Sequence, residues 1–212
     1  EYFVVEADEY DTAFFDKRAK FVHYRPRTLV VTNIEHDHAD IYADLDAILW
    51  QFHQLFRTVP GNGLISVNGR DKNISNLLNK GIWTPVVTFG SGEGANWSAR
   101  YDHIGEKSRF SVFKDGEHVG QADWNLLGLH NLENALAALS SATHAGVTVD
   151  VALKALSKFK GVKRRLEKRG IYKGITLYDD FAHHPTAIRA TIRALRSLEG
   201  NCRIVIVLEL RS

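Results

Sequence analysis

Apolar and polar positions follow one another along the chain in a pattern typical of an α/β protein. Short apolar runs of the kind that form strands lie at residues 2–5, 29–34, 64–67, 86–89, 175–178 and 204–208. Helices are predicted instead at residues 42–60, 73–78, 131–144, 151–159 and 186–198. This order of strands and helices predicts a mostly parallel sheet covered by helices.

Between residues 97 and 127 the pattern changes to short alternating runs, which predict an antiparallel ribbon. A turn signal lies inside this ribbon at residues 114–117, where Gly116 supplies the positive φ angle that a hairpin turn needs. For the helix that follows, we predict Asn131 as the N-cap and Gly146 as the stop signal.

A polar and strongly basic stretch, residues 160–170, is the best candidate for a domain boundary. We therefore expect residues 1–165 to form the later part of one domain and residues 166–212 to begin a second one. The second part holds one βαβ unit, which is too small to bury a sheet by itself. Because the chain begins without Met and contains none, we also expect it to be an interior segment of a longer protein.

Composition narrows the class of protein. The 212 residues are 44% hydrophobic and 25% charged, as in a soluble globular protein, and the formal net charge of +2 gives no general attraction to nucleic acid or membranes. The single cysteine, Cys202, excludes an intrachain disulfide framework. No apolar run reaches the roughly 18–20 residues of a membrane span, and the first residues do not resemble a signal peptide. We therefore expect a cytoplasmic protein.

Two predicted strands end in polar clusters, and open α/β sheets bind ligands at the carboxyl ends of their strands. Glu6 follows the run 2–5, and two acids and two imidazoles follow the run 29–34. A carboxylate such as Glu6 suits Mg²⁺, which accepts one or two carboxylates and completes its octahedron with phosphate and water. An imidazole such as that of His38 is a less common ligand for this ion. The alternative is a solvated strand end that binds no metal.

The second cluster also has a similarity to the zinc site of another enzyme class. His36 and His38 nearly complete the H-x-H-x-D-H pattern of the metallo-β-lactamase-like hydrolases, but Ile41 stands where that pattern requires His. A zinc-dependent hydrolase that uses His36 and His38 is therefore an alternative function.

Three further segments carry side chains suited to ligand binding or catalysis. The basic run 158–169 includes Arg165 and is either a solvated face or an anion site where two domains meet. The loop 179–186 places Asp180 and His183 between a strand and a helix, where an acid is often only a turn former or an N-cap. Three more candidate ligands or helix-capping residues lie near the start of the Ala-rich helix predicted at residues 131–144: His130, Asn131 and Asn134.

Taken in order, these clusters resemble the Mur ligase family of ATP-dependent peptidoglycan amide ligases. The matching segments are Glu6-Ala7-Asp8-Glu9, Thr32-Asn33-Ile34-Glu35 with Asp37-His38 and Asp40, His130-Asn131-x-x-Asn134-Ala135, Gly161-Val162-x-Arg164-Arg165-Leu166-Glu167, and Asp179-Asp180-Phe181-Ala182-His183-His184-Pro185-Thr186. Each motif alone is weak, but five in order across nearly the whole chain are hard to obtain by chance. One departure is the segment 45–56, which lacks the carbamylated lysine of several family members, as in the alanine-adding branch.

The resemblance implies a three-domain enzyme. An amino-terminal domain would bind a UDP-sugar, a central domain would be the ATPase, and a Rossmann-like carboxyl-terminal domain would bind the incoming amine. This chain would then be the later part of the central domain plus the first βαβ unit of the last domain. The family's phosphate loop would precede Glu1.

By motif correspondence, the resemblance assigns two groups of ligand-binding residues to the central domain. Magnesium ions would be held by Glu6 and His38. The adenine end of ATP would meet Asn134, with His130 and Asn131 nearby.

The resemblance further implies that Arg165, Asp180 and His183 reach the nucleotide from the last domain or its linker and take part in catalysis. The sequence of residues 6–18 and 178–187 is most similar to that of the branch that joins UDP-N-acetylmuramate to L-alanyl-γ-D-glutamyl-meso-diaminopimelate in peptidoglycan recycling. The branch that joins UDP-N-acetylmuramate to L-alanine is the alternative within the family.

Overall fold

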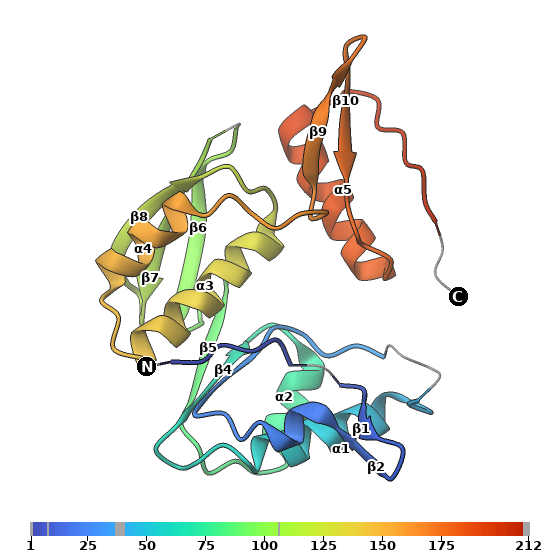
Figure 1. Cartoon of the computed structure of the whole chain (residues 1–212). Helices are drawn as coiled ribbons and strands as arrows, with labels where there is room; N and C mark the ends of the chain where they lie inside the picture. Colours follow the sequence, from blue (N-terminus) through green and yellow to red (C-terminus); the bar gives the residue numbers. More distant parts are fainter. Residues whose placement is uncertain (1, 8, 37–40, 106, 210–212) are drawn as a thin grey trace.

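One six-stranded sheet runs through the larger part of the molecule (Figure 1). The structure, a computed structural model, describes residues 2–7, 9–36, 41–105 and 107–209. In spatial order, the strands are β3 (Thr28–Val31), β4 (Leu64–Asn68), β5 (Val86–Ser91), β6 (Trp97–His103), β7 (Ser108–Lys114) and β8 (Glu117–Trp124). Neighbours from β3 to β6 pair in parallel, and β6, β7 and β8 pair antiparallel. The predicted parallel sheet and antiparallel ribbon are thus confirmed as parts of one sheet.

Helices pack against this sheet in two apolar clusters. The helices are α1 (Leu45–Phe56), α2 (Lys72–Leu78), α3 (Leu129–His144) and α4 (Val149–Lys158). One cluster holds residues of β3, β4, α1 and α2, and the other holds residues of β5 to β8, α3 and α4. Ile65 and Val67 of β4 are fully buried in the cluster that includes α1 and α2. Ser66 between them faces α3, and its Oγ lies 2.6 Å from Oγ of Ser140. This pair of small polar side chains lets α3 approach the strand closely.

Predicted and observed helix boundaries agree to within about four residues, and one predicted cap is wrong. Helix α1 begins after Asp44, whose carboxylate accepts a hydrogen bond of 2.9 Å from the Ala47 N–H. Helix α3 begins two residues before the predicted N-cap, after Gly128 at φ 88°. The prediction of Asn131 as N-cap is therefore wrong: its Nδ2 donates to the Leu127 carbonyl at 2.8 Å. None of the described helices combines the length and apolar character needed to cross a membrane.

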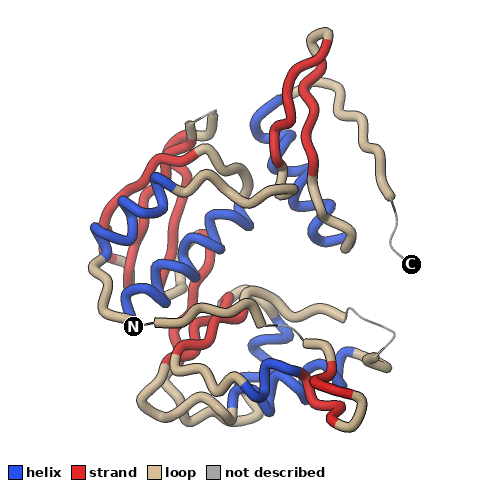
Figure 2. Tube along the Cα trace, in the orientation of Figure 1, coloured by secondary structure: helices blue, strands red, loops and turns tan. Residues whose placement is uncertain are grey.

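The second part of the chain forms a β-hairpin packed beside a helix, set apart from the sheet in Figure 2. It consists of β9 (Glu167–Tyr172), β10 (Ile175–Asp179) and α5 (Pro185–Glu199). Strand β9 begins inside residues 160–170, the stretch predicted as a polar boundary, and continues past it. The predicted strands at residues 2–5 and 204–208 are wrong for the described structure, because a strand needs a neighbour for its hydrogen bonds and none of the described strands pairs with them.

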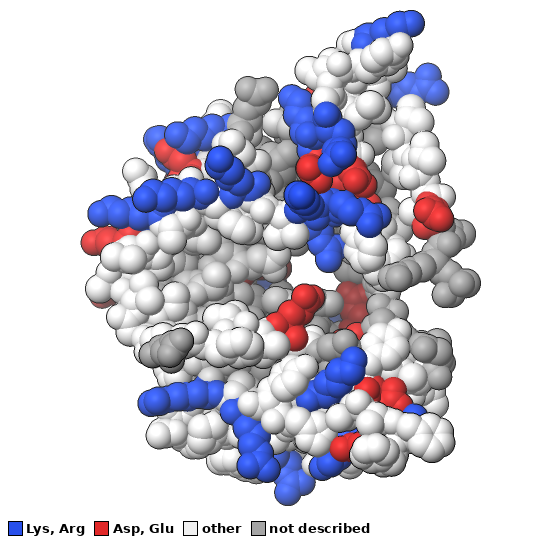
Figure 3. All heavy atoms as spheres, in the orientation of Figure 1, with Lys and Arg blue, Asp and Glu red and all other residues white. Residues whose placement is uncertain are grey.

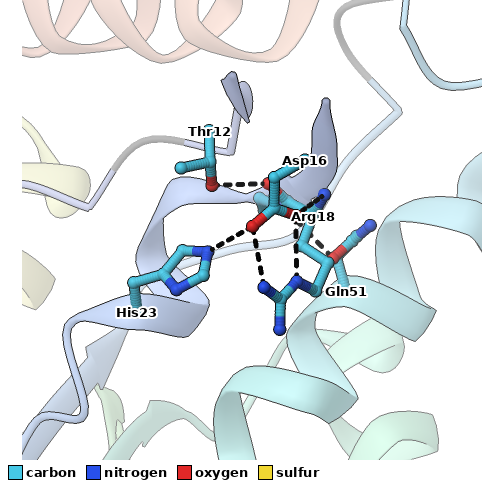
Figure 4. Close-up of polar contacts among 6 residues, drawn as sticks. Thr12, Asp16, Arg18, His23 and Gln51 are labelled. Atoms are coloured by element: carbon cyan, nitrogen blue, oxygen red, sulfur yellow. Dashed lines mark hydrogen bonds and ion pairs between the residues drawn. The ribbon is translucent and has the colours of Figure 1, made fainter. Parts of the chain in front are cut away.

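A small hairpin of β1 (Asp11–Ala13) and β2 (Asp16–Ala19), followed by the 3₁₀ helix η1 (Lys20–His23), lies against α1. The Asp16 carboxylate accepts hydrogen bonds from Nε and Nη2 of Arg18 at 2.9 and 2.7 Å and lies 3.1 Å from Nε2 of His23 (Figure 4). The bound Arg18 guanidinium holds the pKa of Asp16 far below its usual range. The Ala19 N–H donates to Gln51 of α1, so this network fixes the hairpin on the helix.

Candidate functional site

A cleft of about 1340 Å³ opens between the sheet and the second part of the chain. One wall is formed by residues that follow β3, by the ends of β4 and β5 and by α3, and the facing wall by the linker after α4 and the start of α5. The strands β3, β4 and β5 all point their carboxyl ends at this cleft, as expected for an open α/β sheet. In Figure 3 the opening has acidic side chains on its lower rim and basic side chains above it.

The structure brings most of the predicted site residues together in this cleft. Those that line it are Glu6, His130, Asn131, Asn134, Arg165 and Asp180. His183 does not: its ring is exposed, with Nδ1 3.1 Å from the Phe181 carbonyl oxygen. His38 lies outside the described residues. The shared position of the six lining residues is observed, whereas the role of each stays a prediction.

His130 lies on the first turn of α3, where it is largely removed from water. Burial lowers the pKa of His130, and the carboxylates of Asp180 and Glu133 oppose that shift only in part. The ring is therefore neutral at neutral pH and offers one donor and one acceptor nitrogen rather than a positive charge. A neutral ring suits the recognition of an uncharged group such as a base, and not of a phosphate.

Asp180 fixes the linker that carries Arg165. Its two carboxylate oxygens accept different backbone N–H groups, that of Leu166 at 2.6 Å and that of Ala182 at 2.8 Å. On either side of Arg165 the backbone is left-handed, with φ 58° at Arg164 and 50° at Leu166. These twists and the Asp180 hydrogen bonds hold Arg165 at the cleft.

The ring of Phe181 contacts the same arginine. The guanidinium carbons of Arg164 and Arg165 lie 4.9 and 5.5 Å from the centre of this ring, within range of a cation–π contact. The Phe181 N–H also donates to the Arg164 carbonyl at 2.8 Å. The linker and the loop before α5 are thus one connected unit.

Two acidic residues of the cleft have no role predicted from the sequence. Glu133 on α3 accepts hydrogen bonds from Ser91 Oγ at 3.1 Å and from Asn68 Nδ2 at 3.3 Å. Glu35, four residues after the end of β3, contacts the start of α5 on the opposite wall. In the sequence, Glu35 stands in the polar cluster after residues 29–34 and in a family motif, but neither signal indicates a contact across the cleft.

Oxygen ligands for a hard cation are present in the cleft. The carboxylates of Glu6 and Glu9 both line it, and Glu6 is exposed to solvent. Such oxygen donors fit Mg²⁺, which binds proteins through one or two carboxylates. Within the described part of the chain, no three His, Cys, Asp or Glu side chains form a metal-binding group. His36 places Nε2 3.1 Å from the Tyr42 carbonyl oxygen, a contact with no role in zinc binding.

Comparison with known proteins identifies the class to which this fold and cleft belong. The Mur ligase middle domain matches residues 1–142, and the Mur ligase glutamate ligase domain matches residues 164–211. The chain belongs to the Mur ligase family, whose members are ATP-dependent amide ligases of peptidoglycan metabolism. Membership in this family argues against the zinc hydrolase hypothesis.

Individual relatives narrow the comparison. The chain is 50% identical over its whole length to UDP-N-acetylmuramate–L-alanyl-γ-D-glutamyl-meso-2,6-diaminoheptandioate ligase of Haemophilus influenzae, of which it spans 46%. It is 35% identical, over 93% of its length, to UDP-N-acetylmuramate–L-alanine ligase of Caldanaerobacter subterraneus, of which it spans 42%. The crystal structure of the first kind of ligase from Neisseria meningitides is 55% identical, with a TM-score of 0.69 over 75% of this chain and 48% of that one. The chain thus spans about half the length of these relatives.

Proposed function

We propose that this chain forms part of an ATP- and Mg²⁺-dependent ligase that joins UDP-N-acetylmuramate to L-alanyl-γ-D-glutamyl-meso-diaminopimelate in the cytoplasm. The single observation that supports this most strongly is the cleft, where residues of all the ordered family motifs that the structure describes meet from both parts of the chain. The relative named for this reaction in Haemophilus influenzae is also more similar to the chain than the alanine-adding relative.

The residues present suit a reaction through an acyl phosphate. A carboxylate is a poor acyl donor, so the γ-phosphoryl group of ATP is first transferred to the carboxylate of UDP-N-acetylmuramate, and ADP leaves. The amine of the tripeptide then attacks the acyl carbon, and phosphate leaves as the amide forms. Both steps develop negative charge, which fixed cations stabilise where it forms.

Arg165 is the side chain that we assign to this charge stabilisation. It lies at the cleft from the linker, on the side that faces the strand ends, and the hydrogen bonds of Asp180 to the neighbouring backbone fix its position. The neutral ring of His130 and the amides of Asn131 and Asn134, all on one helix, are assigned to the adenine end of ATP. His183 is exposed in this structure and would have to turn toward the cleft to reach the nucleotide.

A magnesium ion would supply electrostatic neutralisation of the phosphates. Glu6 has the donor type for this role, and His38 is its expected partner by resemblance. We also keep the division of the chain into residues 1–165 and 166–212 as a proposal, with the cleft between the two parts.

The experiment compares two amines in an enzyme that extends this sequence to the full length of its relatives. Mg²⁺-ATP and UDP-N-acetylmuramate are supplied with either the tripeptide or L-alanine, and amide product and ADP are measured together. We expect one amide per ADP with the tripeptide and little product with L-alanine. A preference for L-alanine would establish the alternative within the family. The proposal would be overturned if neither amide formed, or if an amide formed without ATP.

Arg165→Ala tests the assignment of the cation in the same assay. We expect kcat/KM to fall by about 100-fold, as when one charge-stabilising donor is removed. Arg169→Ala is the matched control, because its guanidinium pairs with Glu167 at 3.0 Å and does not line the cleft. Equal activity of the two variants would show that Arg165 has no such role.

A further inference from the structure

The cleft is bridged by a contact between Glu35, which follows β3, and the first residues of α5. The Thr186 hydroxyl donates to Oε2 of Glu35 at 2.8 Å, and Nδ1 of His184 lies 3.1 Å from the same oxygen. Glu35 and Thr186 are 151 positions apart in the chain. One carboxylate of the sheet part is therefore joined to two side chains of the second part.

The same two side chains begin helix α5. His184 is its N-cap residue, and Nδ1 also lies 3.4 Å from the Thr186 N–H. When Nδ1 carries its proton it donates to Glu35 and gives up this longer contact, because one nitrogen is not donor and acceptor at once. The shorter distance to Glu35 favours the interaction across the cleft over the local cap.

This contact is connected to the predicted catalytic residues through a short path. His184 follows Asp180 by four residues, and the Asp180 carboxylate binds the Leu166 N–H at 2.6 Å. Leu166 is the neighbour of Arg165. Fixing α5 on Glu35 therefore fixes the loop of Asp180, and Asp180 in turn fixes the linker of Arg165.

We infer that Glu35 is a positioning residue that holds Asp180 and Arg165 over the nucleotide cleft by binding His184 and Thr186. This inference rests on the proposed function, since it specifies how the same cleft is assembled. The side chains of Glu35 and His184 are 31% and 32% exposed, so the contact is moderate in strength and can open and reform. ATP binds the assembled form, and loss of the contact lowers the fraction of molecules in that form.

The first test measures the approach of the two parts directly in this chain. All four tryptophans lie in the sheet part: Trp50, Trp83, Trp97 and Trp124. The single cysteine, Cys202, is exposed and lies in the second part, where Arg196 donates to its carbonyl at 2.7 Å. A fluorescent acceptor on Cys202 therefore reports the distance between the parts through energy transfer from tryptophan.

Energy transfer is compared among four variants of the labelled chain. We expect Glu35→Ala and Thr186→Val to lower the transfer efficiency relative to the parent chain. Thr186→Ser, which keeps the hydroxyl, and Glu117→Ala, which changes an exposed acid at the start of β8, should leave it unchanged. Circular dichroism confirms that each variant is folded. Unchanged transfer in folded Glu35→Ala and Thr186→Val would overturn the inference.

A kinetic split separates positioning from a general structural effect in the full-length enzyme. Because saturating ATP draws the molecules back into the assembled form, we expect Thr186→Val to raise KM for ATP by about 3–10-fold and to leave kcat within twofold. Thr186→Ser should restore KM. A lower kcat at unchanged KM for ATP would show merely a smaller amount of active enzyme and would contradict positioning.

The two proposals fail in different ways. If no amine is ligated but energy transfer still falls in Thr186→Val, the proposed function is wrong and the bridging contact stands. If ligation proceeds and neither transfer nor KM changes in Thr186→Val, the proposed function stands and the role of Glu35 is wrong.

Discussion

Asp180 connects two backbone segments, and its replacement by Asn gives a quantitative test of that connection. One oxygen binds Leu166 N–H and the other binds Ala182 N–H, at 2.6 and 2.8 Å. Asn has the same shape but a single oxygen, so in either orientation of the amide one N–H faces an NH₂ group. A hydrogen bond to a charged group contributes roughly 1.5–3 kcal/mol. Because Asp180 is only half-buried, we expect the loop to lose about 2 kcal/mol, a factor of about 30 in its opening equilibrium.

Hydrogen exchange at the two backbone amides is the appropriate assay. Asp180→Asn should speed exchange about 30-fold at Leu166, at Ala182 or at both. Asp179→Asn is the control, since that carboxylate is 40% exposed and lies 3.9 Å from Arg164. If both amides exchange at the same rate in Asp180→Asn and in the control, the hydrogen bonds do not restrain this loop and the reasoning fails.

Three further predictions concern the metal, pH and the core. Glu6→Gln in the full-length enzyme should raise the Mg²⁺ concentration for half-maximal ligation several-fold, whereas Glu117→Gln should not; equal magnesium titrations would remove Glu6 from the metal site. Since the fold lowers the pKa of His130, it favours the neutral ring, so this group costs stability as pH falls below about 6.5. Between pH 7 and pH 5.5, denaturant unfolding should show a smaller loss of unfolding free energy for His130→Gln than for the parent chain. Leu136→Ala removes a fully buried side chain of α3 and should cost about 2–5 kcal/mol, whereas the exposed Leu129→Ala should change the free energy of unfolding by less than about 0.5 kcal/mol.

The elements that the sequence predicts well are those whose partners are nearby or whose pattern is regular. Helix α1 follows from its apolar spacing, and the β7–β8 turn follows from Gly116, which has φ 86°. The errors at residues 2–5 and 204–208 have a different origin. An apolar run indicates that a segment can form a strand, but pairing depends on a neighbour that the run itself does not specify.

The site shows the same division. Motif order predicts that Glu6, Asn134 and Asp180 share one site, and all three line the cleft. The cleft lies at the carboxyl ends of parallel strands, where open α/β sheets bind ligands. The contact of Glu35 with Thr186 depends on how the linker turns the second part of the chain. That turn comes from left-handed residues that are not glycine, and their conformation has no signal in the sequence.

The two left-handed residues on either side of Arg165 have an energetic consequence for the linker that carries it. A non-glycine residue in this conformation costs of order 1–3 kcal/mol, so the linker by itself prefers other backbone conformations. Surrounding contacts keep it in the observed one. Glycine at position 164 or 166 would remove that cost and at the same time widen the range of directions available to the arginine. Arg165 is therefore held in place against the backbone's own preference, and a relaxed backbone would leave its position less well defined.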